Sequence, residues 1–183
     1  MKLRGASHQL VDADQFAIAV VESRLEDARA ILNRNPDVVR TGNPEEDRLL
    51  ADVAGRNGTL MVAFLIQAGA DLTMPGLDDG TPLHQAAWFG QPKNVELLIE
   101  AGAPLDIFDV TYASSPIGWA VHGSKYSGGS QEREEAYVKV VRLLISAGSS
   151  LHYPGDDHEN AYLDRLLQDA SSKIKTMLEK ESR

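Results

Sequence analysis

The stretch TPLHQAAWFGQPKNVELLIEAGA at residues 81–103 decides the fold of this chain. Its first part predicts a short helix, because Thr81 can cap a helix that begins at Pro82, whose φ is fixed and whose missing amide donor is not needed there. Its second part has apolar residues at helical spacing, and Gly102 follows where a helix ends in the left-handed conformation. The stretch therefore predicts two short helices joined by a turn.

The end of this stretch recurs along the chain. Similar segments are ILNRNPDVV from Ile31, LIQAGADLT from Leu65, LIEAGAPLD from Leu98 and LISAGSSLH from Leu144. Gly69 and Gly102 are 33 residues apart, whereas Gly102 and Gly148 are 46 apart, which equals one period of 33 plus an insertion of 13. A fixed period of this length indicates stacked helical units rather than a conventional globule.

The pattern resembles the ankyrin repeat, because the TPLHxA signature of that family stands at 81–86. Weaker copies are ADVAGRNG at 51–58 and SPIGWAVHG at 115–123, both of which lack the His. The second of these copies is similar to a unit of many bacterial ankyrin proteins, which suggests a bacterial source. The resemblance implies an all-α solenoid of about four to five helix-turn-helix units with degenerate terminal caps.

We expect a single ankyrin-repeat domain over residues 1–183, because this length with 43% apolar residues suits one continuous core. The expected parts are repeats at about 15–43, 46–77, 78–110 and 111–155, followed by a C-terminal cap at 156–183. The insertion at 124–136 has a Gly/Ser-rich turn and then a charged stretch that can extend the second helix of its repeat. Such a long connection is either functional or mobile.

The composition restricts the partners. The chain has 27 acidic residues against 18 Lys and Arg, which gives a net charge of −9. This charge repels nucleic acid and an anionic membrane surface, so we expect neither as a partner. The chain has no cysteine, which removes disulfides and thiolate chemistry.

We expect no secretory signal at the N-terminus and no membrane span. The N-terminus, MKLRGASHQLVDADQF, lacks the apolar run of a secretory signal. The longest uncharged apolar-rich run lies between Arg56 and Asp71 and has 14 residues, fewer than the roughly 18 to 20 needed to span a bilayer. We therefore expect a cytoplasmic protein.

The resemblance implies that two neighbouring aromatic residues face the concave groove of the stack. Trp88 and Phe89 come directly before Gly90, at positions that usually face this groove in ankyrin proteins. Residues of other units add to the same stripe: Arg56, Asn57 and His122. Two adjacent large aromatics cannot both enter one seam between helices, and aromatic and Arg residues are enriched at binding hot spots. The alternative is that one of the two packs under the turn of a neighbouring repeat.

The expected partner is another protein, bound through the groove and the turn tips. Acidic residues recur at the turns, among them Asp78 and Asp79, and stacking would align them into a ridge that suits a basic partner. The other acidic turn positions are Glu45, Glu46, Asp47, Asp106, Asp109, Asp156, Asp157 and Glu159. The alternative is that Asp favours turns because its side chain bonds its own backbone. The protein would be a monomer or, if two grooves pair, a weak homodimer.

The sequence carries no recognisable catalytic constellation. It has no Gly-rich phosphate loop after a strand, no nucleophile elbow and no paired His on a helix face, so we predict no catalytic residue, no cofactor and no metal. The resemblance implies that His84 bonds the backbone of the neighbouring turn. The segment LHYPGDDHE at 151–159 contains metal-ligand types, but its spacing matches no metal motif and we interpret it as a polar turn.

A second hypothesis is an enzyme or small-ligand binder, because a fold does not fix a function. It uses the groove under the 124–136 insertion as a pocket, with His122, Tyr126 or Trp119 reaching into it. Tyr126 is also a candidate partner contact, since it lies in the insertion. Trp119 aligns with Gln85 of the preceding unit, which favours a framework position for the indole.

Overall fold

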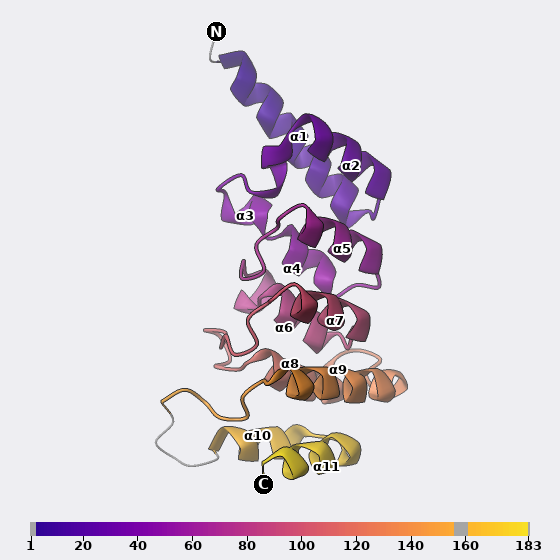
Figure 1. The fold of residues 1–183 in the computed structure, drawn as a ribbon, viewed down its shortest axis with the longest axis vertical. Coiled ribbons are helices and arrows are strands. Elements are labelled where there is room, and N and C mark those ends of the chain that lie inside the picture. The colour runs from indigo at the N-terminus through magenta and orange to yellow at the C-terminus, as the bar shows by residue number, and fades with distance from the viewer. Residues whose placement is uncertain (1–2, 156–160, 183) are drawn as a thin grey trace.

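The computed structural model describes residues 3–155 and 161–182, with side chains from residue 11 onward. This part of the chain is built from helices and contains no strand. The helices form pairs that stack along one axis, from the N-terminal pair at the top to the C-terminal pair at the bottom of Figure 1. The pairs are α1 (Leu3–Val21) with α2 (Leu25–Arg34), α4 (Leu49–Ala54) with α5 (Thr59–Gln67), α6 (Pro82–Trp88) with α7 (Pro92–Glu100), α8 (Pro116–Tyr126) with α9 (Glu134–Ala147), and α10 (Ala161–Asp169) with α11 (Ser172–Glu181). The fold is an all-α helical repeat, as the sequence predicts.

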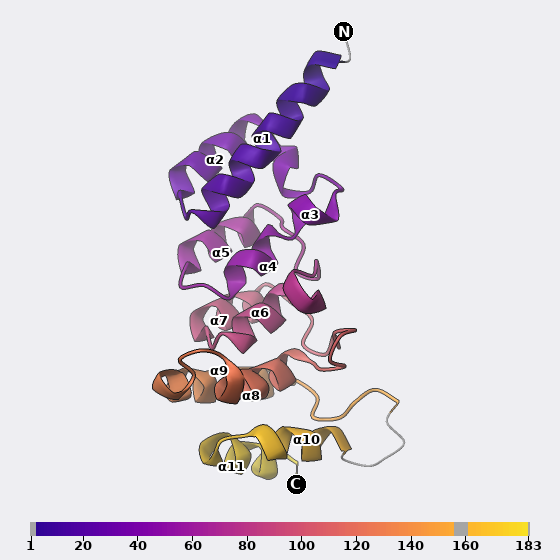
Figure 2. The same ribbon diagram turned by 180° about the vertical axis from the view of Figure 1, so that it is seen from behind.

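Within each layer the first helix lies on one face of the stack and the second helix on the other. Figure 2 shows the first helices turned toward the viewer, and along this face α6 packs between α4 and α8, while α8 also contacts α10. The turns between layers project to one side and carry short helical segments such as α3 (Pro44–Asp47) and η2 (Leu77–Asp79). First helices and turns together therefore form one continuous surface.

The predicted helix boundaries are confirmed. The glycines that end three of the second helices have φ values of +86° at Gly69, +85° at Gly102 and +98° at Gly148. This is the left-handed conformation that favours glycine at a helix end. Among the paired helices, α6, α7 and α8 begin with a proline at their first position: Pro82, Pro92 and Pro116.

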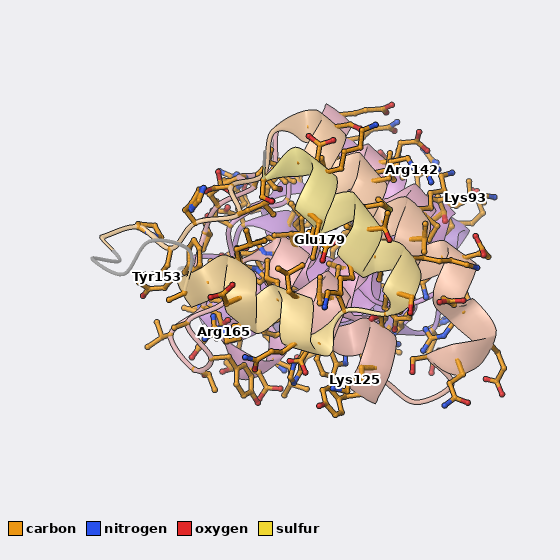
Figure 3. The ribbon with its side chains drawn as sticks, turned by 90° about the horizontal axis from the view of Figure 1, so that it is seen from below. Lys93, Lys125, Arg142, Tyr153, Arg165 and Glu179 are labelled. Carbon is orange, nitrogen blue, oxygen red and sulfur yellow. The ribbon has the colours of Figure 1, made fainter. Side chains whose placement is uncertain are left out.

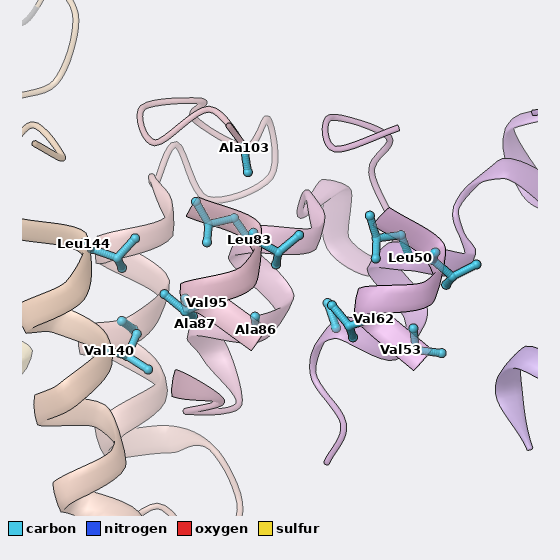
Figure 4. Close-up of a cluster of buried hydrophobic side chains, with 14 of the residues drawn as sticks. Leu50, Val53, Val62, Leu83, Ala86, Ala87, Val95, Ala103, Val140 and Leu144 are labelled. Atoms are coloured by element: carbon cyan, nitrogen blue, oxygen red, sulfur yellow. The ribbon is translucent and has the colours of Figure 1, made fainter. Parts of the chain in front are cut away.

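One apolar core runs between the helices of successive layers, as Figure 4 shows for the middle of the stack. Leu83 and Val95 are fully buried there, and each Å² of apolar surface removed from water contributes about 25 cal/mol. Ala86 and Ala87 are also fully buried, and their small side chains allow close packing against α4 and α8. A Cβ at Gly123 of α8 would collide with the main-chain carbonyl of Trp88, so the packing of α8 on α6 requires glycine at this position.

The N-terminal helix is longer than the expected first unit. α1 begins at Leu3, upstream of the expected start near residue 15, and its first turns extend beyond the rest of the stack in Figure 1. Ala13 is buried together with Phe16, Ala19 and Val20, so the buried face of the helix starts before the unit boundary that the repeat register indicates. None of the helices in the described parts of the chain is long and apolar enough to cross a membrane.

The insertion lengthens both helices of its layer. α8 has 11 residues where α6 has 7, and α9 has 14 where α7 has 9. The charged stretch therefore extends the second helix, as predicted, with α9 beginning at Glu134. Arg133 donates to the carbonyl oxygens of Phe89 and Gly128 at 2.5 Å each, and the Tyr137 hydroxyl donates to the carbonyl of Trp88 at 2.8 Å. These bonds fasten the insertion to the C-terminal end of α6.

Candidate binding site in the groove

The site rests on a buried hydrogen-bond network at the beginning of α6. The main-chain N–H of Thr81 donates to Nδ1 of His84 at 3.2 Å, while Nε2 of His84 lies 3.1 Å from the carbonyl oxygen of Ser114 in the next turn. Nδ1 is therefore the acceptor and Nε2 carries the proton. His84 thus bonds the neighbouring turn, which confirms the structural role implied by the ankyrin resemblance.

Burial sets the charge state of His84. The imidazole is fully buried, and desolvation lowers its pKa to about 4, although the carbonyl of Ser114 and the charge of Asp109 act in the opposite direction. A protonated ring would also present a second N–H toward the amide of Thr81, where an acceptor is needed. The ring is therefore neutral at neutral pH and serves to fix the stack.

A pocket of about 400 Å³ lies on the surface formed by the first helices and the turns. Its walls come from the turn around η2, from α6 and α8, from the turn before α8, and from α10 of the C-terminal pair. The lining residues are Leu77, Asp78, Gln85, Trp88, Phe89, Tyr112, Ser114, Gly118, Trp119, Val121, His122, Arg165, Leu166 and Asp169. The pocket therefore spans three successive layers of the stack.

Three aromatic rings contact one another along the pocket wall. The ring of Trp119 lies edge-on to Trp88, with centroids 5.9 Å apart and an interplanar angle of 73°. It lies edge-on to Tyr112 as well, at 6.1 Å and 71°. Trp119 is buried and its Nε1 donates to the Asp109 carboxylate at 2.9 Å. The framework position expected for Trp119 is thus correct, but the same ring also forms part of the wall.

Trp88 and Phe89 point in different directions from the end of α6. Trp88 contacts α8 through Trp119 and through His122, whose ring centroid is 5.9 Å away. Phe89 instead covers Gly55 at the end of α4, where an added Cβ would collide with the phenyl ring. The two aromatics therefore reach the layers on either side of their own, and Phe89 stays 38% exposed.

The structure brings only some of the predicted contact residues together. Trp88, Phe89, His122 and Asp78 line the pocket. The remaining predicted contact residues lie outside the lining: Arg56, Asn57, Tyr126 and Asp79. Arg56 donates to the carbonyl of Val21 at 3.1 Å, one layer toward the N-terminus, so the predicted stripe extends along the stack beyond the pocket.

Tyr126 belongs to a polar cluster at the edge of the pocket. Its ring lies 4.4 Å from that of His122, and Asp169 of α10 accepts from Nδ1 of His122 at 2.8 Å and from Lys125 at 3.1 Å. Burial alone would raise the pKa of the Asp169 carboxyl, but the hydrogen bonds from Lys125 and His122 lower the pKa overall. In Figure 3, Lys125 and Arg165 lie on the α10 side of the stack, opposite Lys93 and Arg142.

The acidic turn residues do not form one exposed ridge. Asp47 and Asp109 are buried, and both accept from main-chain N–H groups of their own turns, as from Thr41 at 2.7 Å and Ser114 at 3.1 Å. The ridge prediction is wrong for these two positions, because their carboxylates replace missing backbone partners inside the turn. Asp156, Asp157 and Glu159 lie outside the described residues.

Asp78 and Asp79 are the exposed acidic pair nearest the pocket. Both have positive φ values, 54° and 58°, a conformation that costs energy for residues other than glycine and is least unfavourable for Asp and Asn. Asp79 accepts from the Thr111 hydroxyl at 3.1 Å. Backbone strain of this kind is often found where a side chain is held for binding. Asp78 at the pocket wall is therefore a candidate binding residue.

Sequence reasoning missed the part of the pocket that comes from the C-terminal pair. Arg165 and Leu166 line the pocket from α10, and Arg165 donates to the carbonyl of Ala113 at 2.8 Å. The repeat pattern treats this segment only as a cap. One feature of the sequence pointed to it. Gly118 stands where the repeat pattern expects a His, and the missing side chain leaves space for a residue from the next layer.

The pocket is not the one expected under the insertion. No residue of 124–136 is part of its lining, because Arg133 and Tyr137 hold the insertion against the end of α6. The second hypothesis was therefore wrong about the location, although Trp119 and His122 do line the pocket that is present. Within the described residues no group of three or more His, Asp or Glu side chains has the arrangement of a metal site.

Comparison with known protein families agrees with this architecture. Residues 48–99, which span α4 to α7, match the family described as ankyrin repeats (many copies). Residues 48–99 of the chain therefore form ankyrin repeats. No curated protein matches it. Ankyrin repeats generally serve as protein–protein interaction modules.

Proposed function

We propose that the chain binds another protein through the surface formed by its first helices and turns, with the pocket between α6, α8 and α10 as the anchor point. The observation that carries this proposal is the aromatic wall built by Trp88, Trp119 and Tyr112. Binding hot spots are enriched in aromatic residues and in pockets that exclude water around one inserted side chain.

The exposed apolar residues around the pocket support the same reading. Leu77 is 65% exposed and Phe89 is 38% exposed, and both line the pocket. A partner segment laid along the groove would cover them and would also meet Arg56, Asn57 and Tyr126. Asp78 and Asp79 favour a partner with a basic surface. A bacterial source, the cytoplasm as compartment, the monomer or weak homodimer, and the single domain over 1–183 stay predictions.

The test compares two surface leucines in affinity capture from the source cell. Leu77→Ser changes the pocket wall, whereas Leu60→Ser changes another exposed leucine, on α5 and outside the pocket lining. Both variants should fold normally, because substitutions of exposed residues usually change stability by less than about 0.5 kcal/mol. We expect Leu77→Ser to reduce capture of the partner several-fold and Leu60→Ser to leave it unchanged. Equal capture by both variants would contradict the proposal.

A second candidate function is the binding of a small molecule. The volume of about 400 Å³ lies within the range of small-ligand sites, roughly 300 to 1,000 Å³, which are also mostly apolar with a few polar groups. Native mass spectrometry of the purified chain should then detect a bound low-mass compound that Leu77→Ser releases. A chain that carries no such compound and shows no thermal shift with metabolite mixtures would exclude this candidate.

A further inference from the structure

Three aromatic rings of the pocket wall pack at steep angles to one another, so their π faces and edges point in more than one direction. Trp119 lies nearly perpendicular to Trp88 and to Tyr112, at 73° and 71°. A planar guest stacks on one ring, whereas rings at right angles surround a rounded guest. The faces of such rings carry negative quadrupole potential and attract cations, and aromatic cages of this kind bind quaternary ammonium groups.

Apart from Asp78, several polar groups of the wall are already used inside the protein. The side-chain amide of Gln85 donates to the carbonyl of Leu77 at 2.7 Å, and the indole N–H of Trp119 donates to Asp109 at 2.9 Å. Asp169 accepts from Lys125 and His122. A guest with many N–H donors would therefore find few free acceptors. A cation without N–H donors does not have this cost, because it leaves no buried donor without an acceptor.

The two carboxylates in the lining, Asp78 and Asp169, differ in their partners. Asp78 lines the pocket, and within the described residues its side chain takes part in no hydrogen bond or ion pair. The positive charge of Arg165 lies on the α10 side, where its guanidinium covers the ring of Tyr162 at 5.0 Å. The negative charge of Asp78 thus stands at the η2 turn, whereas the guanidinium of Arg165 donates to the carbonyl of Ala113 in the turn before α8, so a cationic guest is favoured on the Asp78 side of the pocket.

We propose that the pocket binds the trimethylammonium head of a trimethyllysine side chain on the partner protein. Trp88, Trp119 and Tyr112 would contact the methyl groups, Asp78 would supply the negative charge, and the exposed apolar side chain of Leu77 would cover the aliphatic stem. Unmethylated lysine is strongly hydrated and has three donors, and arginine is planar with five donors, so both fit this wall less well. The inference rests on the proposed protein-binding function.

The tryptophans supply a direct readout. The chain has two tryptophans, Trp88 and Trp119, and both line the pocket, so intrinsic fluorescence reports on this site alone. The full chain is titrated with three peptides that differ at one residue: trimethyllysine, lysine, or the uncharged carbon isostere of trimethyllysine. We expect the trimethyllysine peptide to bind at least about fivefold more tightly than the isostere, as cation–π attraction requires, and more tightly than lysine.

A matched pair of variants tests the role of charge. Asp78→Asn removes the carboxylate in the pocket, and Asp79→Asn removes its neighbour, which lies outside the lining. Both positions have positive φ, which Asn tolerates, so neither change should disturb the turn. We expect Asp78→Asn to weaken binding of the trimethyllysine peptide several-fold without affecting the isostere. Asp79→Asn should weaken binding of the trimethyllysine peptide clearly less than Asp78→Asn does.

The outcomes separate this inference from the proposed function. Equal affinities for the charged peptide and its isostere, or no fluorescence response to any peptide, would overturn the trimethyllysine proposal. If Leu77→Ser still reduces partner capture in that case, the docking surface stands and its guest is apolar. If Leu77→Ser has no effect on capture, the docking surface itself is wrong.

Discussion

The hydroxyl of Tyr162 occupies the space beside Gly118, where an added Cβ would collide with it. By the offset of 34 that maps Thr81 onto Ser115, Gly118 takes the position of His84. The main-chain N–H of Ser115 donates to the Tyr162 hydroxyl at 3.0 Å, as that of Thr81 donates to His84. The C-terminal pair therefore supplies, from another layer, the partner that this repeat lacks.

Removal of the Tyr162 hydroxyl should loosen the C-terminal pair. In Tyr162→Phe the buried N–H of Ser115 loses its acceptor, which costs about 1–3 kcal/mol. Chemical denaturation should show this loss in the free energy of unfolding. Tyr153→Phe is the matched control, because Tyr153 packs in the same aromatic group and its hydroxyl forms no hydrogen bond among the described residues. An unchanged free energy of unfolding in Tyr162→Phe would contradict the inference that the Tyr162 hydroxyl takes the role that His84 has in the preceding repeat.

Gly123 should not tolerate a side chain. In Gly123→Ala the new methyl group meets the main-chain carbonyl of Trp88, which cannot rotate away as a side chain can. We expect a loss of about 2–3 kcal/mol from overpacking and a lower thermal midpoint. Gly128→Ala serves as the control, since a Cβ there meets no atom within 4 Å. Similar midpoints for the two variants would show that α8 can move away from α6.

His84 should make stability depend on acidic pH. Its folded pKa of about 4 lies below the ordinary histidine pKa of 6.5, so the unfolded chain binds the proton more strongly between these pH values. Its stabilising contribution is present above pH 6.5 and is lost as pH falls to about 4, with a total of about 3 kcal/mol at 1.36 kcal/mol per pKa unit.

Urea unfolding at several pH values measures this effect, and proton NMR of the His84 ring gives the pKa independently. The non-titrating variant His84→Gln should lack this part of the pH dependence. Identical slopes of stability against pH in wild type and variant, together with a ring that titrates near 6.5, would mean that His84 is not desolvated.

Asp109 should hold the pocket wall in place. Its carboxylate accepts from the N–H groups of Tyr112 at 2.5 Å and Ser114 at 3.1 Å, and from the indole of Trp119 at 2.9 Å. In Asp109→Ala the buried indole N–H and the two partly buried main-chain N–H groups lose a charged acceptor, so we expect a loss of about 3 kcal/mol and a red-shifted tryptophan emission. Asp106→Ala, which removes a more exposed turn carboxylate, should leave the tryptophan emission unchanged. If both variants shifted the emission equally, Asp109 would have no specific role in holding the wall.

The sequence by itself determined the repeat fold and the local roles within each unit. Gly102 at a helix end, Pro82 at a helix start and His84 three residues after Thr81 have their effect over one or two turns of chain. Such short-range patterns constrain the backbone directly, and the period of 33 residues implies that the units stack. These predictions therefore did not depend on how one layer is rotated against the next.

Only the tertiary structure decided how the pocket is built. Trp88 and Phe89 are adjacent in sequence, yet one contacts α8 and the other covers Gly55 of the α4 layer. Tyr162 bonds Ser115, a residue 47 positions earlier. Contacts of this kind depend on the rotation between layers and on which residue fills a space left by another, and neither is encoded in a local pattern. The pocket exists because three layers meet there, whereas the sequence specifies each layer almost independently.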